Sequence, residues 1–312
     1  MMKLAFVFPG QGSQSVGMLA DYAGHPVVRA TFDEASAVLG QDLFALVENG
    51  PAEALNQTVN TQPVMLAAGV AVWRAWVAAG GPQPVVLAGH SLGEYTALVA
   101  AGALTFADAL PLVRFRAQAM QDAVPAGVGA MAAVLGLDDA GVAAACVAAA
   151  QGQQVEPVNF NAPNQVVIAG HREAVERAVA ACKAAGAKRA VMLPVSAPFH
   201  SSLLKPAAER LAQRLAEVAV ATPSIPVLHN VDVQVHADAA GIRTALARQA
   251  ASPVRWVETI QAIIAGGATH VVECGPGKVL SGLTRRIAPD VASLALADDA
   301  AFDAVRAELA AP

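Results

Sequence analysis

The sequence is poor in cysteine and in clustered charge. Its 312 residues include three cysteines, and none forms a C-x-x-C pair. An odd number of cysteines without that spacing argues against a disulfide framework and against a zinc site. The 20 basic and 25 acidic residues give a formal net charge of -5, with no block of like charge. Nucleic-acid binding requires a basic stripe, so we expect no nucleic-acid partner.

Long apolar runs are also missing. The longest one, residues 63–73, is shorter than the roughly 20 residues that a membrane-spanning helix needs. The short run at 4–8 ends at Pro9-Gly10, before the hydrophobic region of a signal peptide could form. We therefore expect a soluble, cytoplasmic protein with no membrane partner.

The amino-acid composition predicts a helix-rich protein with a large hydrophobic core. Hydrophobic residues make up 55% of the chain and charged residues only 14%, which argues against disorder. Expected strands alternate with expected helices, which predicts a parallel sheet covered on both faces. The strands are 4–8, 85–88 and 270–273. The helices with two expected ends are 62–79, 94–101, 203–219, 240–250 and 255–266. A further helix is capped by Thr105 and Asp108 and reaches about residue 123, and another begins at 278.

The middle of the chain has a different rhythm. Strands are expected at 131–135, 156–160, 166–169 and 189–194, with helices at 138–150 and 171–185. The order β-α-β-β-α-β is that of a ferredoxin-like unit, which closes its own small core. We therefore expect a larger α/β domain from residues 1–126 and 197–312, with a ferredoxin-like small domain, 127–196, inserted in it.

A nucleophile motif lies between the second strand and the helix after it. Residues 89–93 read Gly-His-Ser-Leu-Gly, which fits the Gly-x-Ser-x-Gly elbow. The glycines allow a sharp turn that carries the serine oxygen beyond the sheet edge. The N–H groups of the following helix then favour negative charge at the same place. Ser91 is the predicted nucleophile.

The sequence pattern alone does not identify the base and the oxyanion-hole donors that would act with this serine. A serine hydroxyl needs a base, and the chain has seven histidines. His90 adjoins the serine, but neighbours in a tight turn usually point apart, and His200, in a turn before a helix, is one candidate. The loop at 9–14 lacks both the third glycine of a dinucleotide fingerprint and the lysine of a phosphate-binding loop. It could supply N–H groups to an oxyanion hole or be an ordinary turn.

Six segments, taken together, resemble one family. They are Gly-Gln-Gly-Ser-Gln at 10–14, Gly-His-Ser-Leu-Gly at 89–93, Arg-Phe-Arg-Ala-Gln-Ala-Met at 114–120, Pro-Val-Asn-Phe-Asn at 157–161, Pro-Phe-His-Ser at 198–201 and Gly-Pro-Gly-Lys at 275–278. The chain resembles the malonyl-CoA:acyl carrier protein transacylases of fatty acid synthesis over essentially its whole length. The resemblance implies an α/β-hydrolase-like larger domain with an inserted ferredoxin-like domain.

The resemblance also implies a set of roles. Ser91 would be the nucleophile and His200 its base, oriented by the main-chain carbonyl of Gln249 instead of an acid. The backbone N–H groups of Gln11 and Leu92 would form the oxyanion hole.

A further implied role concerns the acyl group. Arg116 would bind the malonyl carboxylate, although the helical pattern alone barely distinguishes it from Arg114. The implied reaction is a ping-pong transfer from malonyl-CoA to the phosphopantetheine thiol of acyl carrier protein, with no cofactor and no metal, by a monomer.

Three other functions remain open from the sequence. A serine hydrolase acting on acyl thioesters shares the elbow, but it normally places an acid between serine and histidine. A malonyl transferase subunit of a malonate decarboxylase would keep all six segments, and a pseudo-enzyme could dock carrier protein without chemistry. Because carrier proteins are acidic, docking would need a basic patch on this chain. The candidate residues, each of which could equally be an ordinary surface charge, are Arg172, Lys183, Lys188, Arg189, Lys278, Arg285 and Arg286.

Overall fold

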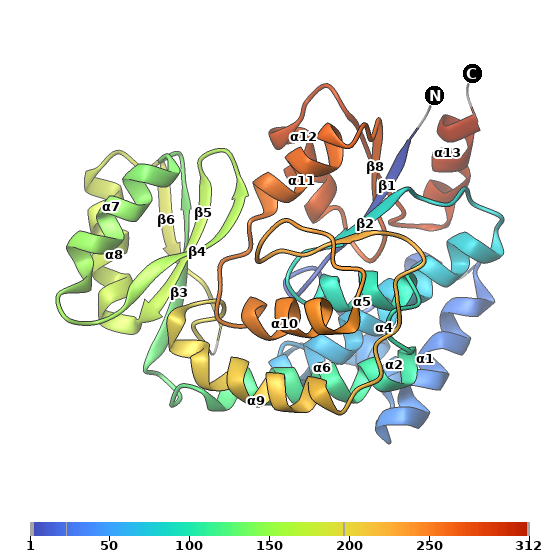
Figure 1. Ribbon diagram of the computed structural model, residues 1–312, viewed down its shortest axis with the longest axis horizontal. Helices are drawn as coiled ribbons and strands as arrows, with labels where there is room; N and C mark the ends of the chain where they lie inside the picture. Colours follow the sequence, from blue (N-terminus) through green and yellow to red (C-terminus); the bar gives the residue numbers. More distant parts are fainter. Residues whose placement is uncertain (1–2, 23, 196, 311–312) are drawn as a thin grey trace.

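The computed structural model describes residues 3–22, 24–195 and 197–310 (Figure 1). The expected boundary residues 1, 196 and 312 lie outside these ranges. The fold is mixed α/β, with one parallel sheet and a separate antiparallel sheet. Within the described ranges, the parallel sheet has the order β7-β2-β1-β8-β9. Its strands are β1 (Leu4–Phe8), β2 (Val86–Gly89), β7 (Val227–Leu228), β8 (His270–Glu273) and β9 (Ala292–Ala295).

The central strand β1 shows why this sheet is covered on both faces. All five of its residues are buried. Leu4, Phe6 and Phe8 belong to the large core that includes the helix α4 (Thr58–Ala78). Ala5 and Val7 belong to a second core, beneath α11 (Trp256–Ala265) and α12 (Val279–Ile287). The near-continuous apolar run therefore faces helices on each side, as the sequence predicts for a parallel strand.

The remaining helices of the larger unit surround these cores (Figure 1). Helix α6 begins where the sequence predicts, because the Thr105 hydroxyl oxygen accepts the Asp108 N–H at 3.1 Å. No helix within the described ranges is both long and apolar enough to cross a membrane. The other bounds are α1 (Pro26–Leu39), α2 (Leu43–Asn49), α3 (Ala52–Leu55), α5 (Gly93–Ala100), α6 (Phe106–Asp122), α9 (Lys205–Ala216), α10 (Ala239–Gln249) and α13 (Asp299–Ala310), with short 3-10 turns at Ala20–Tyr22 and Ser202–Leu204.

Helix α4 begins earlier than the sequence predicts. The expected start at 62 places Pro63 in the first turn, where proline is well tolerated. In the structure the helix begins at Thr58, and Pro63 lies inside it. The buried Thr61 hydroxyl donates to the carbonyl of Leu55 at 2.6 Å, which anchors this added turn to the preceding segment.

The second unit forms the antiparallel sheet at the left of Figure 1. Its elements are β3 (Gly129–Leu135), α7 (Asp139–Ala150), β4 (Val155–Ala162), β5 (Gln165–His171), α8 (Arg172–Ala184) and β6 (Arg189–Met192), and the strand order is β4-β5-β3-β6. Both helices pack on one face, where they share a core with β3 residues such as Ala132 and Val134. Met131 and Val167 point to the opposite face and join the core of the larger unit. The small sheet is therefore covered on one side by its own helices and on the other by the larger unit.

Three loops meet at the carboxyl end of the parallel sheet. Strand β1 lies between β2 and β8, so the loop that follows each of these strands is at one edge. Such an edge is where open α/β sheets bind their ligands. The loops are tightly packed: a Cβ atom at Gly93 would lie 2.0 Å from the Phe8 carbonyl oxygen, and one at Gly10 would lie 2.5 Å from the His90 carbonyl oxygen. Only glycine fits at these two places.

Candidate active site

Ser91 lies at the tip of the turn between β2 and α5. Its φ angle is 51°, in the left-handed region that is strained for a residue with a side chain. The turn is closed so tightly that a Cβ atom at Gly89 would lie 1.9 Å from the Gly93 carbonyl carbon. The predicted elbow is therefore present as a strand, a strained serine and a helix. The turn carries Ser91 into the lining of a cavity.

His200 is the histidine that faces this serine. Its Nε2 atom lies 2.7 Å from the Ser91 Oγ, and its Nδ1 atom lies 2.9 Å from the Gln249 carbonyl oxygen. A carbonyl oxygen can only accept, so Nδ1 carries the proton in the neutral ring. The Nε2 lone pair then points at the serine hydroxyl. Gln249 is the last residue of α10, and a carbonyl at a helix end has no partner within its own helix.

The environment of His200 keeps its ring neutral. The side chain is almost fully buried. Burial, aided by the positive charge of Arg116, lowers the pKa of His200 to about 3, although the bond to the Gln249 carbonyl acts in the opposite direction. At neutral pH the imidazole is therefore able to accept a proton from Ser91.

Arg116 is a buried cation beside the serine. It projects from α6 and is 1% exposed. Its Nη1 donates to the Gln62 Oε1 at 2.9 Å, and its Nη2 donates to the Gln249 Oε1 at 2.8 Å and to the Ser91 Oγ at 3.3 Å. Among the described residues no carboxylate pairs with it, and its Nε has no hydrogen-bond partner. The hydrogen-bond partners of this buried guanidinium are thus two amides and a hydroxyl, and its Cζ lies 5.5 Å from the centre of the Tyr95 ring. A buried cation whose partners are all neutral can accept an anion as an additional partner.

The neighbouring arginine behaves differently. Arg114 is partly exposed and reaches to the end of α1, where it donates to the carbonyl of Leu39, the last residue of the helix, and to the side chain of Gln41 just beyond it. The two arginines, which the helical pattern hardly separates, therefore differ in whether they reach the cavity. Arg116 lines it.

Gln11 and Leu92 bring backbone N–H groups to the same place. Both residues line the cavity. The loop after β1 packs on the elbow, because a Cβ atom at Gly10 would lie 3.6 Å from the Leu92 nitrogen. Within the described part of the chain, neither N–H donates a hydrogen bond to another residue. Two backbone N–H groups without a protein acceptor are therefore found in the lining of the cavity that holds Ser91.

The cavity of about 440 Å³ lies between the two units. The larger unit contributes the serine, the histidine and the arginine, whereas the second unit contributes one face of its sheet. His90 points away from the Ser91 hydroxyl, as expected, and its Nε2 lies 2.8 Å from the Asn161 Oδ1. The sheet of the second unit contributes Met131, Asn159, Asn161 and Val167, and the segment after β6 contributes Leu193, Pro194 and Val195.

Three polar lining residues, Gln62, Asn159 and Asn161, were not expected from sequence reasoning. Asn159 and Asn161 are two positions apart in β4, and this alternation is the signal that could have placed both on one face. Gln62 lies in the apolar interior of α4, where a buried amide must have a partner, and that partner is Arg116.

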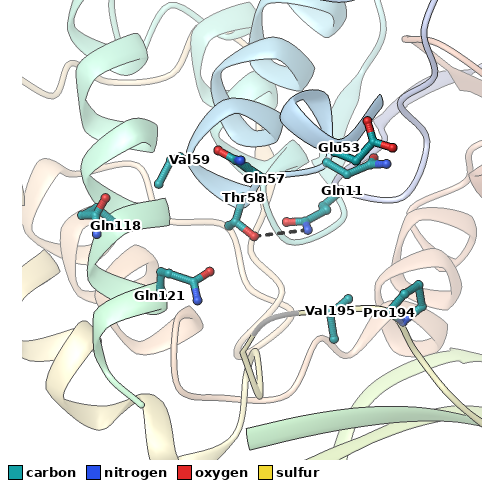
Figure 2. Close-up of a pocket in the computed structure, with 10 residues that line it drawn as sticks. Gln11, Glu53, Gln57, Thr58, Val59, Gln118, Gln121, Pro194 and Val195 are labelled. Carbon is teal, nitrogen blue, oxygen red and sulfur yellow. Dashed lines mark hydrogen bonds between the residues drawn. The ribbon is translucent and has the colours of Figure 1, made fainter. Parts of the chain in front are cut away.

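A second hollow adjoins the cavity that holds Ser91. Its volume is about 420 Å³, and it shares Gln11, Asn56, Pro194 and Val195 with the cavity. Figure 2 shows amide side chains around this hollow, with the Gln11 amide directed at Thr58 (Nε2 to Oγ1, 3.4 Å). Amide side chains from Gln11, Asn56, Gln57, Gln118 and Gln121 therefore line the hollow next to the Ser91 cavity.

Comparison with known proteins gives consistent matches. Residues 5–297 match the acyl transferase domain family. The chain is 58% identical over 305 residues to the malonyl CoA-acyl carrier protein transacylase of Salmonella typhimurium, covering 97% of this chain and 99% of that protein.

Solved structures agree with this match. The acyl-carrier-protein S-malonyltransferase of Burkholderia pseudomallei superposes with a TM-score of 0.97 at 62% identity, covering 98% of this chain and 100% of that one. A malonyl-transacylase solved in complex with the acyl-carrier protein of a type II PKS has a TM-score of 0.97 at 54% identity, with coverage of 98% and 99%.

Proposed function

The chain belongs to the acyl transferase domain family, and from this membership we propose that it transfers the malonyl group of malonyl-CoA to acyl carrier protein. It is an acyltransferase that supplies malonyl units for fatty acid synthesis. The solved relative bound to an acyl-carrier protein supports that class of acceptor. The substrate-specific part of the proposal depends on the cavity itself.

The observation that carries the malonyl assignment is the environment of Arg116. The guanidinium is buried, lies 3.3 Å from the Ser91 Oγ, and is bonded to neutral amides. A malonyl group esterified to Ser91 ends in a free carboxylate a few bonds from that oxygen. A planar guanidinium binds a carboxylate with two parallel hydrogen bonds. An acetyl group, which has no such carboxylate, would leave the arginine without an ion partner.

The first half-reaction forms an ester on Ser91. The His200 Nε2 takes the hydroxyl proton while Oγ attacks the thioester carbonyl carbon of malonyl-CoA. The N–H groups of Gln11 and Leu92 donate to the oxyanion of the tetrahedral intermediate. When the intermediate collapses, the C–S bond breaks and the His200 Nε2–H protonates the departing CoA thiolate.

The second half-reaction runs the same chemistry with the carrier. The phosphopantetheine thiol gives its proton to the His200 Nε2, and its sulfur attacks the ester carbonyl carbon. The C–O bond to Ser91 breaks, and His200 returns the proton to Oγ. The ester oxygen and the histidine thus return to their starting states. Between the two steps the ester must be protected from attack by water, and the position of Ser91 in a cavity between the two units supports such shielding.

The domain boundaries expected from the sequence fit this proposal. We assign residues 127–196 as a ferredoxin-like insertion in an α/β-hydrolase-like domain formed by 1–126 and 197–312. The strand order β4-β5-β3-β6, with both helices on one face, supports the assignment. A monomeric state, a cytoplasmic location and a reaction without cofactor remain predictions.

Intact-protein mass spectrometry tests nucleophile, donor and acceptor together. Mixing the protein with malonyl-CoA is expected to add one malonyl group, which peptide mapping locates on Ser91, and holo acyl carrier protein is expected to remove it. Ser91→Ala is the matched control and should stay unmodified. A malonyl group on another residue would contradict the mechanism. Release of free malonate as fast as transfer to the carrier would favour a thioester hydrolase.

A further inference from the structure

The backbone of the nucleophile turn is spanned by one buried carboxamide. Asn230, in the loop after β7, is fully buried. Its Oδ1 accepts the Ser91 N–H at 2.8 Å, and its Nδ2 donates to the Gly89 carbonyl at 2.8 Å. The orientation of the amide is determined by these partners, because an N–H can only donate and a carbonyl can only accept. The side chain therefore links both sides of the elbow.

Asn230 is itself held by a buried ionisable pair. Its backbone N–H donates to the Glu94 Oε2 at 2.8 Å, while the Glu94 Oε1 lies 2.7 Å from the His229 Nδ1. The side chains of Glu94 and His229 are both fully buried. Burial opposes the charged form of His229, but the Glu94 carboxylate outweighs it and raises the pKa of His229. A carboxylate in such a place must be satisfied by its neighbours, so the loop position of Asn230 is determined by α5.

These three residues stand behind the site and do not touch the substrate cavity. In the described part of the chain, the cavity lining contains Ser91, Leu92 and His90 but none of Glu94, His229 and Asn230. Glu94 lies in the first turn of α5, three residues after the nucleophile. Any effect on chemistry must therefore pass through the backbone of the turn.

The turn needs such support because Ser91 is strained. A left-handed φ at a residue with a side chain costs about 1–3 kcal/mol and persists only where the surroundings impose it. Asn230 holds the Ser91 N–H, and the Gln249 Nε2 holds the Ser91 carbonyl at 3.0 Å. Asn230 also occupies the N–H of Ser91, which leaves the N–H of Leu92 as the elbow donor that faces the cavity.

We propose that Asn230 is a positioning residue: it keeps Ser91 in its strained conformation and assigns the oxyanion role to Leu92, while Glu94 and His229 hold Asn230 in place. This inference rests on the proposed role of Ser91 as nucleophile. Because a displacement of about 1 Å at a reacting group costs on the order of 100-fold in rate, loss of this support is expected to lower kcat roughly 10- to 100-fold.

The test compares Asn230→Ala and Asn230→Asp with a control on the same loop, Gln234→Ala, whose side chain is exposed. Asn230→Asp keeps the shape and an acceptor for the Ser91 N–H, but turns an oxygen toward the Gly89 carbonyl. We expect both variants to lose kcat with KM for malonyl-CoA changed less than threefold. They should also react at least tenfold more slowly with a fluorophosphonate that labels Ser91, while Gln234→Ala matches the wild type in both assays.

Thermal unfolding separates positioning from stability. A purely structural role would lower Tm and leave kcat and labelling of the folded protein within twofold of wild type, which would overturn the inference. If Asn230→Ala does not fold, the shape-matched Asn230→Asp decides by the same criteria. A wild-type protein that the fluorophosphonate does not label at Ser91 would overturn the proposed function and, with it, this role. If the wild type is labelled at Ser91 and both variants are labelled equally fast, only the role of Asn230 is overturned.

Discussion

Ser91 and His200 lie 2.7 Å apart, Oγ to Nε2, and both have left-handed backbone conformations, with φ angles of 51° and 65°. Each residue is thus presented by a strained turn, one after β2 and one before α9. The pair is assembled from two turns that the rest of the fold must hold in place. This explains why hydrogen bonds to backbone atoms, from Asn230 and Gln249, are concentrated here.

The acid limb of the pH profile should be displaced far below that of an ordinary histidine. His200 has a pKa of about 3, lowered from 6.5 mainly by burial, so it is protonated in only about one molecule in a hundred at pH 5. Because kcat/KM reports ionisations of the free enzyme, we expect it to stay level between pH 8 and pH 5. Circular dichroism at each pH should verify that the protein stays folded.

Removing the neighbouring positive charge provides the matched control for this profile. Arg116 contributes to lowering the pKa of His200. In Arg116→Ala the acid limb should therefore move to higher pH. A limb centred near pH 6.5 in the wild type would contradict a buried, neutral His200.

Arg116→Ala should change donor selectivity more than it changes general reactivity. Truncating one partner of a buried ion pair costs about 2–5 kcal/mol, which corresponds to a loss of roughly 30-fold or more in kcat/KM for malonyl-CoA. The acetyl group of acetyl-CoA has no carboxylate that Arg116 could bind, so any acetyl transfer should fall much less. Arg114→Ala, in the same helix but directed at Gln41, should leave the ratio unchanged. Equal losses for both donors would exclude a carboxylate-binding role.

Gln249→Ala should separate what the backbone of this residue does from what its side chain does. The bond from the carbonyl oxygen to the His200 Nδ1 should survive the substitution. The side chain's bonds to Arg116 (2.8 Å) and to the Ser91 carbonyl (3.0 Å) are lost. We expect a fall of roughly 10- to 100-fold in kcat/KM for malonyl-CoA, since a hydrogen bond to a charged group such as Arg116 is worth about 1.5–3 kcal/mol.

The acid limb of the kcat/KM pH profile distinguishes the role of the Gln249 carbonyl from that of its side chain. It should stay below pH 5 in the variant, because the orientation of His200 is preserved. A pH profile that changes as much as the rate would mean that the side chain, and not the carbonyl, orients His200.

The elements with strong local patterns were predicted closely. The bounds of β1 and β8 are those expected, whereas α7 begins one residue later than expected and α8 is one residue shorter at each end. Strand β7 was missed because it has only two residues, and it is defined by the pairing of these two residues with Leu87 and Ala88 of β2. Strand β9 and helix α13 were also missed, because their short alanine-rich segments show no clear alternation and depend on packing against β8 and the core.

The site residues also fall into those that a local pattern predicts and those that depend on tertiary packing. Ser91 could be found locally, because the elbow needs its own strand, glycines and helix. His200 lies 109 positions later, so the residues alone left it as one candidate among seven. Arg116 and Arg114 share a helix, and only packing decides which is buried. Asn230 had no signal in the sequence, since a buried asparagine in a loop reads like a turn residue.

The Gln249 carbonyl was found through resemblance alone, and it has a consequence for how this enzyme can vary. Every amino acid carries the same carbonyl oxygen, so no point substitution can delete the acceptor that orients His200. In enzymes that use an aspartate for this task, a single codon change can abolish it. Here the position of the carbonyl oxygen depends on the length and path of the backbone at the end of α10, so changes there are the ones that can remove it. A one-residue insertion or deletion between Gln249 and Ser252 should therefore be more damaging than any replacement of Gln249, and mutational tolerance at position 249 would understate its importance.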